Sequence, residues 1–257
     1  MTDITPVVLT YNELPNIGRT LDQLAWADHV IVVDSESTDG TLDILACYPN
    51  VEVVVRPFDV LSDQWNAGLE YVKTEWVLSL DADHVLSDAL VRELESLPDD
   101  PNTDGYRGHF VYKVGGHPLR GTLYPPKVVL FRNAKGRFTQ DGHANLLDLD
   151  GRAGDLRGVL YHDDRKSRAR WLSNQIGYTK LEAHKLLTTP TAELGRNDRI
   201  RRTGLAPFLI PFYCLVLKGL VLDGRMGLTY TYERTYAELL LALQLLDLRL
   251  SATPDHA

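Results

Sequence analysis

The first hundred residues alternate between strand-like and helix-like sequence, and this pattern limits the fold more than any other feature. Short apolar runs, such as residues 29–34 (HVIVVD) and 51–55 (VEVVV), indicate β-strands that are buried on both faces. The segments between the runs, such as residues 62–72, carry apolar residues at helical spacing. Four such alternations predict an α/β fold with a mostly parallel sheet flanked by helices.

The pattern changes after about residue 105. From there, shorter strand-like runs are separated by glycine and proline, and we expect them to extend the sheet as antiparallel strands. These runs are residues 105–116, 127–138 and 158–162. Residues 167–187 then predict a helix. We therefore expect a sheet domain over residues 1–165 and a helical, apolar C-terminal region over residues 166–257.

Polar residues gather where three of the predicted strands end. The three clusters are residues 10–13 (TYNE), 34–41 (DSESTDGT) and 81–84 (DADH). Ligands of open α/β sheets bind beyond the carboxyl ends of the strands. Asp81 and Asp83 are two residues apart, so on an extended chain they point to the same side about 6.5–7 Å apart and favour Mg²⁺ or Mn²⁺. The alternative is that one aspartate caps a helix starting near Ser87 and the other is solvated.

The other two strand ends offer polar groups of different kinds. Asp34 ends the second strand, and residues 39–41 suit a turn and a helix N-terminus whose amides could serve a ligand. Tyr11 offers a flat face for a base, and Glu13 offers an acceptor for hydroxyl groups. Each has a structural alternative, which is a capped turn for the Asp34 loop, a core position for Tyr11 and a first-turn helix position for Glu13.

Four motifs, taken in chain order, resemble a known family. They are residues 5–24 (TPVVLTYNELPNIGRTLDQL), 29–41 (HVIVVDSESTDGT), 65–68 (WNAG) and 76–84 (WVLSLDADH). They look like the nucleotide-sugar-binding half of family 2 glycosyltransferases, which have the GT-A fold. The resemblance is close over about residues 4–90 and looser to about residue 165. Within the family it is greatest to the bacterial enzymes that add sugars to the lipopolysaccharide core, which also carry an apolar C-terminal segment.

The resemblance implies a role for each residue at the strand ends. Tyr11 and Asp34 would contact the uracil base of a UDP-sugar, and Glu13 would lie near its ribose. Asp81 would hold the ribose or a metal-bound water. Asp83 would bind the Mn²⁺ or Mg²⁺ ion that bridges the diphosphate, and such an ion neutralises charge on the departing nucleoside diphosphate.

Two positions depart from the family pattern. Family members often have an arginine before the asparagine of WNAG and an acidic residue after the second aspartate, whereas this chain has Gln64-Trp65-Asn66 and His84. Because of these two departures, an alternative function remains, which is that of a non-catalytic nucleotide-sugar-binding or membrane-associated partner protein with the same fold. Two enzymatic rivals fit less well. A nucleotidyltransferase would carry a glycine-rich loop with a lysine near its first strand, and a phosphohydrolase would carry its nucleophilic aspartate there.

Inverting members of the family use a carboxylate as general base on the acceptor hydroxyl. Residues 136–147 (GRFTQDGHANLL) best match the loop that carries it, which makes Asp141 the predicted catalytic base. His143 would either orient the acceptor or serve a structural role. By the same resemblance His162, at the end of a predicted strand, would complete the metal shell, with a surface histidine as the alternative. Rival candidates for the base are Asp148, Asp150, Asp163 and Asp164.

Residues 205–222 are apolar but are interrupted by Lys218 and two prolines. A membrane-spanning helix needs about 20 apolar residues, so this segment is marginal for crossing a bilayer. Four basic residues precede it, and such a pattern favours anionic lipid headgroups. They are Arg196, Arg199, Arg201 and Arg202. We expect residues 196–222 to dock on a membrane surface, with a buried core helix, a contact in a homo-oligomer and a true span as alternatives.

The net charge, the N-terminal sequence and the cysteines bear on the partners and the location of the protein. The net charge of -8 argues against nonspecific nucleic-acid binding. The N-terminus shows no basic leader before its short apolar stretch, and the two cysteines form no metal spacing, so we expect a cytoplasmic protein, peripheral at the inner membrane face. We interpret the chain as a metal-dependent inverting glycosyltransferase. It would move a hexose, with glucose favoured, from a UDP-sugar to a glycan or lipid-linked acceptor such as the lipopolysaccharide core.

Overall fold

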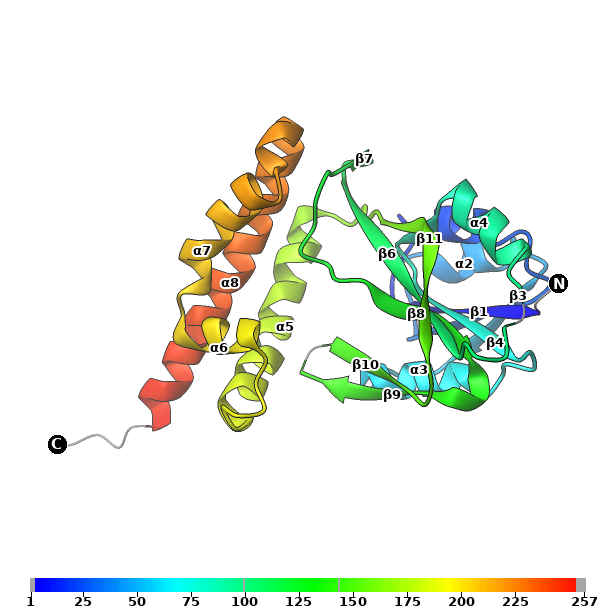
Figure 1. Ribbon diagram of the computed structural model, residues 1–257, viewed down its shortest axis with the longest axis horizontal. Coiled ribbons are helices and arrows are strands. Elements are labelled where there is room, and N and C mark those ends of the chain that lie inside the picture. Colours follow the sequence, from blue (N-terminus) through cyan, green and yellow to red (C-terminus); the bar gives the residue numbers. More distant parts are fainter. Residues whose placement is uncertain (1–2, 99, 143, 253–257) are drawn as a thin grey trace. The chain divides into compact units, whose positions relative to one another are not determined.

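The computed structural model describes residues 3–98, 100–142 and 144–252. The chain divides into two units (Figure 1). The first consists of Met1–Pro118, Thr122–Gln140 and Asn145–Lys166. The second consists of Leu119–Gly121, Asp141–Ala144 and Ser167–Ala257.

Four parallel strands form the centre of the first unit, in the order β3-β2-β1-β4. They are β1 (Ile4–Thr10), β2 (Val30–Asp34), β3 (Val51–Val55) and β4 (Trp76–Asp81). Because β2 and β4 lie on opposite sides of β1, the chain changes direction across the sheet here, which is where α/β sheets bind ligands. The register pairs Thr10 with Asp34 and Leu9 with Asp81. The polar strand ends therefore meet at one edge of the sheet.

The sheet continues from β4 in the order β8-β6-β11-β5. The added strands are β5 (His84–Leu86), β6 (Gly105–Val114), β8 (Lys127–Arg132) and β11 (Ala153–His162), and β7 (His117–Pro118) pairs with β6. β8 is antiparallel to both neighbours, as expected, but β11 is parallel to β6. The expectation of purely antiparallel additions is wrong because the hairpin of β9 (Gly136–Asp141) and β10 (Ala144–Leu149) separates β8 from β11, and β11 then runs in the direction of β6.

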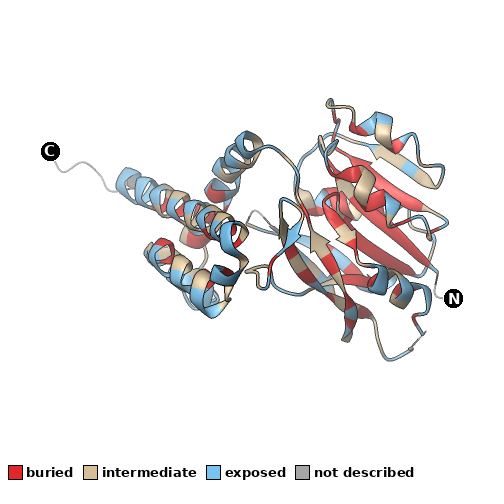
Figure 2. Cartoon of the chain, turned by 90° about the horizontal axis from the view of Figure 1, so that it is seen from above, coloured by how far each residue is buried: buried red, intermediate tan, exposed pale blue. Residues whose placement is uncertain are grey.

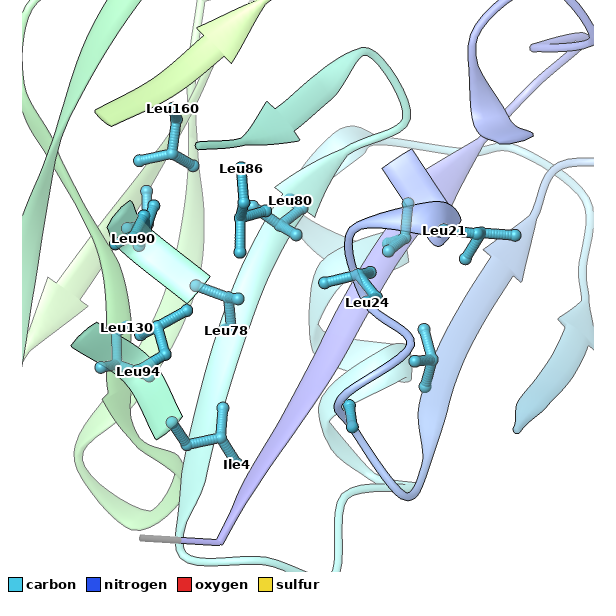
Figure 3. Packing of buried hydrophobic residues seen from close by; sticks show 14 of the residues in the cluster. Ile4, Leu21, Leu24, Leu78, Leu80, Leu86, Leu90, Leu94, Leu130 and Leu160 are labelled. Carbon is cyan, nitrogen blue, oxygen red and sulfur yellow. The ribbon is translucent and has the colours of Figure 1, made fainter. Parts of the chain in front are cut away.

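Helices cover both faces of the sheet, as Figure 1 shows for α2, α4 and α3. The helices of this unit are α1 (Ile17–Asp22), α2 (Thr41–Leu45), α3 (Leu61–Leu69) and α4 (Asp88–Glu95). Leu78 and Leu80 of β4 belong to the same buried cluster as Leu90 of α4 and Leu21 of α1 (Figure 3), whereas Val77 packs with α3 on the other face. Burying one such side chain stabilises the fold by about 1.5–3 kcal/mol, so β4 is held firmly up to its polar end.

The N-terminus of α4 shows that neither aspartate of the DADH motif caps this helix. Ser87 is the capping residue, and its Oγ accepts a hydrogen bond from the backbone N–H of Leu90 at 3.2 Å. The same oxygen accepts from the N–H of Val159 in β11 at 3.2 Å. The capping alternative for Asp81 and Asp83 is therefore wrong.

The second unit is helical. Its elements are α5 (Arg168–Thr188), α6 (Arg196–Thr203), α7 (Ala206–Phe212), the π-helical turn η2 (Tyr213–Leu217), the 3-10 turn η3 (Leu220–Asp223) and α8 (Gly224–Ala252). Ala183, Leu186, Leu194, Leu241 and Leu245 form a small core. Figure 2 shows much of the helical surface in the exposed colour. Among the described residues, no single helix is long and apolar enough to cross a membrane. The two segments Arg196–Thr203 and Ala206–Leu217, which meet at a bend of 118°, together reach the length and apolar composition of a membrane-spanning helix.

Candidate active site

The DADH motif lies at the end of β4 in a turn that other parts of the chain hold. The hydroxyl group of Thr20 donates a hydrogen bond to the carbonyl of Ala82 at 2.7 Å, and the N–H of Asp163 donates to the carbonyl of Asp83 at 3.0 Å. Asp81 is the last residue of β4, and β5 begins two residues after Ala82. The two aspartates are therefore brought together by a tight turn between strands, and the extended segment expected from the sequence is not found.

His84 lies between the two carboxylates. Its Nδ1 accepts a hydrogen bond from the backbone N–H of Asp81 at 3.0 Å, so the proton of the neutral ring is on Nε2. Nε2 lies 3.4 Å from Asp81 Oδ2 and 4.0 Å from Asp83 Oδ1. Burial lowers the pKa of His84 to about 3, so the ring is neutral at neutral pH. His84 therefore fixes the turn through the hydrogen bond that its Nδ1 accepts, whereas its Nε2 has no hydrogen-bond partner among the described residues.

Asp83, His84 and His162 bring potential metal-binding atoms within 4.8 Å of one another. The Nδ1 lone pair of His84 is used by the N–H of Asp81 and its Nε2 carries the proton, so in this arrangement the neutral ring has no lone pair left for a metal. His162 Nε2 lies 3.4 Å from Asp83 Oδ2. Asp83 Oδ1 is buried and has no hydrogen-bond partner among the described residues. Asp83 and His162 therefore fit a small divalent cation, and their role as metal ligands stays a prediction.

The charges around Asp83 also favour a bound divalent cation. Burial raises the pKa of Asp83 to about 7, and the charges of Asp81 and Asp164 act in the same direction, against the opposing effect of Lys166. A buried carboxyl group with too little positive charge nearby gains from a bound cation.

Lys166 is a site residue that the sequence interpretation missed. Its Nζ lies 2.6 Å from Glu13 Oε1, 3.5 Å from Asp164 Oδ1 and 3.9 Å from Asp83 Oδ2. Burial lowers the pKa of Lys166, but these carboxylates outweigh burial and raise it, so the side chain is charged. Burial raises the pKa of Glu13 to about 7 despite this contact. The structure thus places Glu13 in the same cluster as Asp83.

The segment around Lys166 is attached to the start of α1. Arg19 donates to Asp163 at 2.7 Å, and Arg165 ion-pairs with the same carboxylate at 2.7 Å. Asn16 accepts from the N–H of Arg165 at 2.8 Å and donates to Asp164 at 2.9 Å. These contacts explain why asparagine and arginine occur in the NIGR part of the first motif. They also engage Asp163, a rival candidate for the base, in two ion pairs.

Lys127 is the second residue that was missed, and it lies beside Asp81. Its Nζ is 3.8 Å from Asp81 Oδ2 and lies over the ring of Tyr124, 5.2 Å from the centroid. Desolvation raises the pKa of Asp81, but other effects, of which the charge of Lys127 is the largest, outweigh it and lower the pKa. Asp81 is therefore an ionised acceptor, and its side chain is 39% exposed. This is the accessibility that a ligand-binding role requires.

Asp34 and Tyr11 differ sharply in exposure. Tyr11 is 54% exposed, whereas Asp34 is fully buried. The carboxylate of Asp34 accepts hydrogen bonds from the N–H and hydroxyl of Ser37 at 2.7 and 2.6 Å and from the hydroxyl of Thr10 at 2.8 Å. Ser37 Oγ in turn accepts from the N–H of Asn12 at 2.6 Å. Asp34 therefore holds the loops after β1 and β2 together, and its contact with a base stays a prediction.

The WNAG motif holds α3 on the sheet. Asn66 donates to the carbonyl of Phe138 at 2.9 Å and accepts from its N–H at 3.0 Å. A Cβ on Gly68 would lie 2.7 Å from a side-chain carbon of Val7, which only glycine avoids. Gln64 is buried and donates to the carbonyl of Pro57 at 2.8 Å. The motif and its Gln64 departure thus serve packing in this structure.

Asp141 belongs to the second unit. It ion-pairs with Lys185 of α5 at 2.8 Å, and its side chain is 48% exposed. Asp198 lies 3.7 Å from the same ammonium group. The role of Asp141 as general base stays a prediction. His143 lies outside the described residues.

Comparison with known proteins decides the family. The sequence matches Glycosyl transferase family 2 over residues 6–185. The chain belongs to this family. The family 2 assignment accounts for the GT-A type sheet and for the acidic turn at the end of β4, and it makes the protein a glycosyltransferase.

One curated relative is also a glycosyltransferase by name, and two solved structures share the fold. The chain is 28% identical over 225 residues to the lipopolysaccharide core biosynthesis glycosyltransferase LpsC of Rhizobium meliloti, covering 83% of this chain and 80% of that one. The mannosyltransferase PcManGT from Pyrobaculum calidifontis, in complex with GDP-Man and Mn²⁺, shares the fold with a TM-score of 0.56 at 18% identity, over 95% and 87% of the two chains. S. aureus TarS in complex with UDP-GlcNAc shares it with a TM-score of 0.51 at 17% identity, over 96% and 92%.

Proposed function

We propose that this glycosyltransferase transfers a hexose from a UDP-sugar, with the help of a divalent cation held by Asp83 and His162. The observation that carries the proposal is the buried Asp83 Oδ1, which has no hydrogen-bond partner among the described residues and lies in a cluster rich in carboxylates. One fold neighbour was solved with GDP-Man and Mn²⁺ and another with UDP-GlcNAc, which supports a nucleotide-sugar and a cation as ligands of this fold. When bound, the cation would neutralise charge on the departing diphosphate.

Other residues of the chain would bind the nucleoside and activate the acceptor. The exposed face of Tyr11 would stack on the base, and Asp81, kept ionised beside Lys127, would accept hydrogen bonds from ribose hydroxyl groups. His84 would keep the turn that carries Asp81 and Asp83 in place through the hydrogen bond that its Nδ1 accepts from the N–H of Asp81. In an inverting reaction, Asp141 would take the proton of the acceptor hydroxyl as it attacks the anomeric carbon.

UDP and UDP-glucose should stabilise the purified protein only when Mn²⁺ or Mg²⁺ is present. A ligand at about 100 times its dissociation constant adds about 2.7 kcal/mol to the free energy of unfolding, which a thermal shift detects. Asp83→Ala should lose the effect. Asp155→Ala, which removes an exposed carboxylate of β11, should keep it. Stabilisation by nucleotide that is equal with and without metal would contradict the cation's part of the proposal. Nucleotide binding without release of UDP in the presence of acceptor would favour a binding protein.

For the acceptor, we propose a glycan or lipid-linked molecule such as the lipopolysaccharide core. The relative LpsC is named as a glycosyltransferase of lipopolysaccharide core biosynthesis, which supports this acceptor. Glucose is the sugar that we propose for the donor. An acceptor anchored in lipid requires the enzyme to approach a membrane, at its inner face if the enzyme is cytoplasmic.

The second unit offers an apolar surface for that approach. It consists of Leu205, Phe208, Leu209, Phe212, Val216, Leu217, Val221 and Leu222, each at least half exposed. Arg196 and Arg225 are exposed on the same unit, and Lys218 lies within the apolar segment. Arg201 is engaged by Glu182 and Glu238, so it is less available for headgroups than the sequence suggested. Apolar side chains with flanking cations complement an anionic bilayer surface, and we propose such a bilayer as the partner.

Co-sedimentation with lipid vesicles tests this surface. The protein should bind vesicles that contain phosphatidylglycerol, and Phe208→Ser/Phe212→Ser should lower the partition coefficient at least about tenfold because two exposed phenyl groups are lost. Leu250→Ser, which changes a 72% exposed residue near the end of α8, is the matched control. An equal loss in both variants would contradict docking through residues 205–222. A dimer in sedimentation that the double substitution disrupts, without vesicle binding by the native protein, would assign the surface to a second copy.

A further inference from the structure

Lys166 is a buried ammonium group placed against the proposed cation site. Its side chain is only 11% exposed, and its Nζ faces the carboxylates of Glu13, Asp83 and Asp164 at 2.6, 3.9 and 3.5 Å. Burying a lysine charge is costly unless carboxylates compensate for it, and here three do. Lys166 therefore serves as a counter-ion that the chain itself supplies to this site.

An internal counter-ion at this position opposes a second cation. A small divalent ion lies about 2 Å from a carboxylate oxygen that binds it, so an ion on Asp83 Oδ2 would lie no more than about 6 Å from the ammonium group. Repulsion between buried charges at this separation is screened only weakly. Lys166 and the cation also compete for the same carboxylate, since Asp83 faces both.

We propose that Lys166 makes cation binding depend on the nucleotide. Without nucleotide, its ammonium group compensates the carboxylates and weakens the affinity of Asp83 and His162 for a divalent ion. With nucleotide, the negative charge of the diphosphate offsets the repulsion between the two cations. This inference rests on the proposed function, because it assumes that the cation and the nucleotide share the site.

The side chain of Lys166 is suited to the site both without and with a bound nucleotide. It has three N–H donors on a flexible four-carbon stem, and of its three carboxylate neighbours only Glu13 lies at the distance of a strong hydrogen bond. Turning from Glu13 to a phosphate oxygen would keep the ammonium group paired. By thermodynamic linkage, the factor by which nucleotide tightens Mn²⁺ binding equals the factor by which Mn²⁺ tightens nucleotide binding. Lys166 would enlarge that factor and so favour loading of the two together.

Binding of Mn²⁺ measured by electron paramagnetic resonance, without and with saturating UDP, tests the proposal. The Lys166→Gln variant removes the charge but can still donate a hydrogen bond to Glu13, so we expect it to fold. Without UDP it should bind Mn²⁺ at least tenfold more tightly than the native protein. With UDP the difference should vanish or reverse.

Two control variants separate charge from other effects. The Lys166→Arg variant keeps the charge and should behave like the native protein. The Lys135→Gln variant removes an ammonium group that pairs with the exposed Asp150, near the opposite end of β4, and should also leave Mn²⁺ affinity unchanged. Equal Mn²⁺ affinity of Lys166→Gln and native protein without UDP would overturn the proposal, as would an equal gain in Lys166→Arg. If the native protein binds no Mn²⁺ even with UDP, the proposed function itself fails, and this inference fails with it.

Discussion

Replacing Asp83 with asparagine is expected to lower kcat/KM by at least about 10³-fold, because a catalytic cation supplies several kcal/mol of transition-state stabilisation and each 1.4 kcal/mol is tenfold in rate. Asparagine is close to aspartate in size but lacks the charge that holds the cation. The carbonyl of Asp83 that accepts from Asp163 belongs to the backbone and is unaffected. The loss in kcat/KM is measured from the rate of UDP release in the presence of acceptor, over a range of Mn²⁺ concentrations.

The stability of the same variant distinguishes loss of chemistry from loss of fold. Burial raises the pKa of Asp83 from 3.8 to about 7, so its ionised form is disfavoured in the folded protein, and the stability it contributes falls as pH rises toward 7. At pH 8 without metal, Asp83→Asn removes a carboxylate that burial destabilises, and its Tm should be no lower than that of the native protein. Asp155→Asn should leave both activity and Tm unchanged. Native-like turnover by Asp83→Asn would exclude Asp83 as the ligand of a catalytic cation.

The parallel half of the sheet could be predicted because its strands are buried on both faces and so appear as continuous apolar runs. β2 is an example, since every one of its residues is buried. The short strand β5 could not be predicted in this way. It has only three residues, and its pairing with β11 depends on contacts between residues about 75 positions apart in the sequence.

In the candidate site, too, contacts between residues far apart in the sequence could not be predicted. Asp83 was predicted from its position at a strand end and His162 from the family resemblance, and the structure brings their side chains to 3.4 Å. Lys166 and Lys127 were missed because a lone lysine has no local pattern that separates a buried counter-ion from a solvated side chain. Lys166 meets Glu13 across 153 positions of sequence. Asp34 has a structural role that its position at a strand end did not reveal. Its carboxylate accepts three hydrogen bonds from Ser37 and Thr10, while its contact with a base stays a prediction.

Replacing Asp34 with alanine is expected to lower the free energy of unfolding of the first unit by at least about 3 kcal/mol, since hydrogen bonds to a charged group contribute about 1.5–3 kcal/mol each and buried donors left without partners add a penalty. The substitution removes the acceptor of the Ser37 N–H, the Ser37 hydroxyl and the Thr10 hydroxyl together. Urea unfolding followed by tryptophan fluorescence measures the loss. Asp39→Ala, in the same loop but only partly buried, should cost only about 1 kcal/mol, because its hydrogen bonds are partly exposed to water.

The asparagine variant at this position separates the two roles of Asp34. In Asp34→Asn the amide oxygen would still accept from the Ser37 N–H, and the amide nitrogen can donate to the Thr10 hydroxyl, so this variant should lose less stability than Asp34→Ala. If Asp34 only holds the loops, UDP affinity should follow stability and change little in Asp34→Asn. If it also contacts uracil, UDP affinity should fall about tenfold or more while most of the stability remains, because an amide replaces a charged acceptor at the base. A free energy of unfolding of Asp34→Ala equal to that of the native protein would contradict the loop-holding role, since three buried hydrogen bonds cannot be lost without a cost in stability.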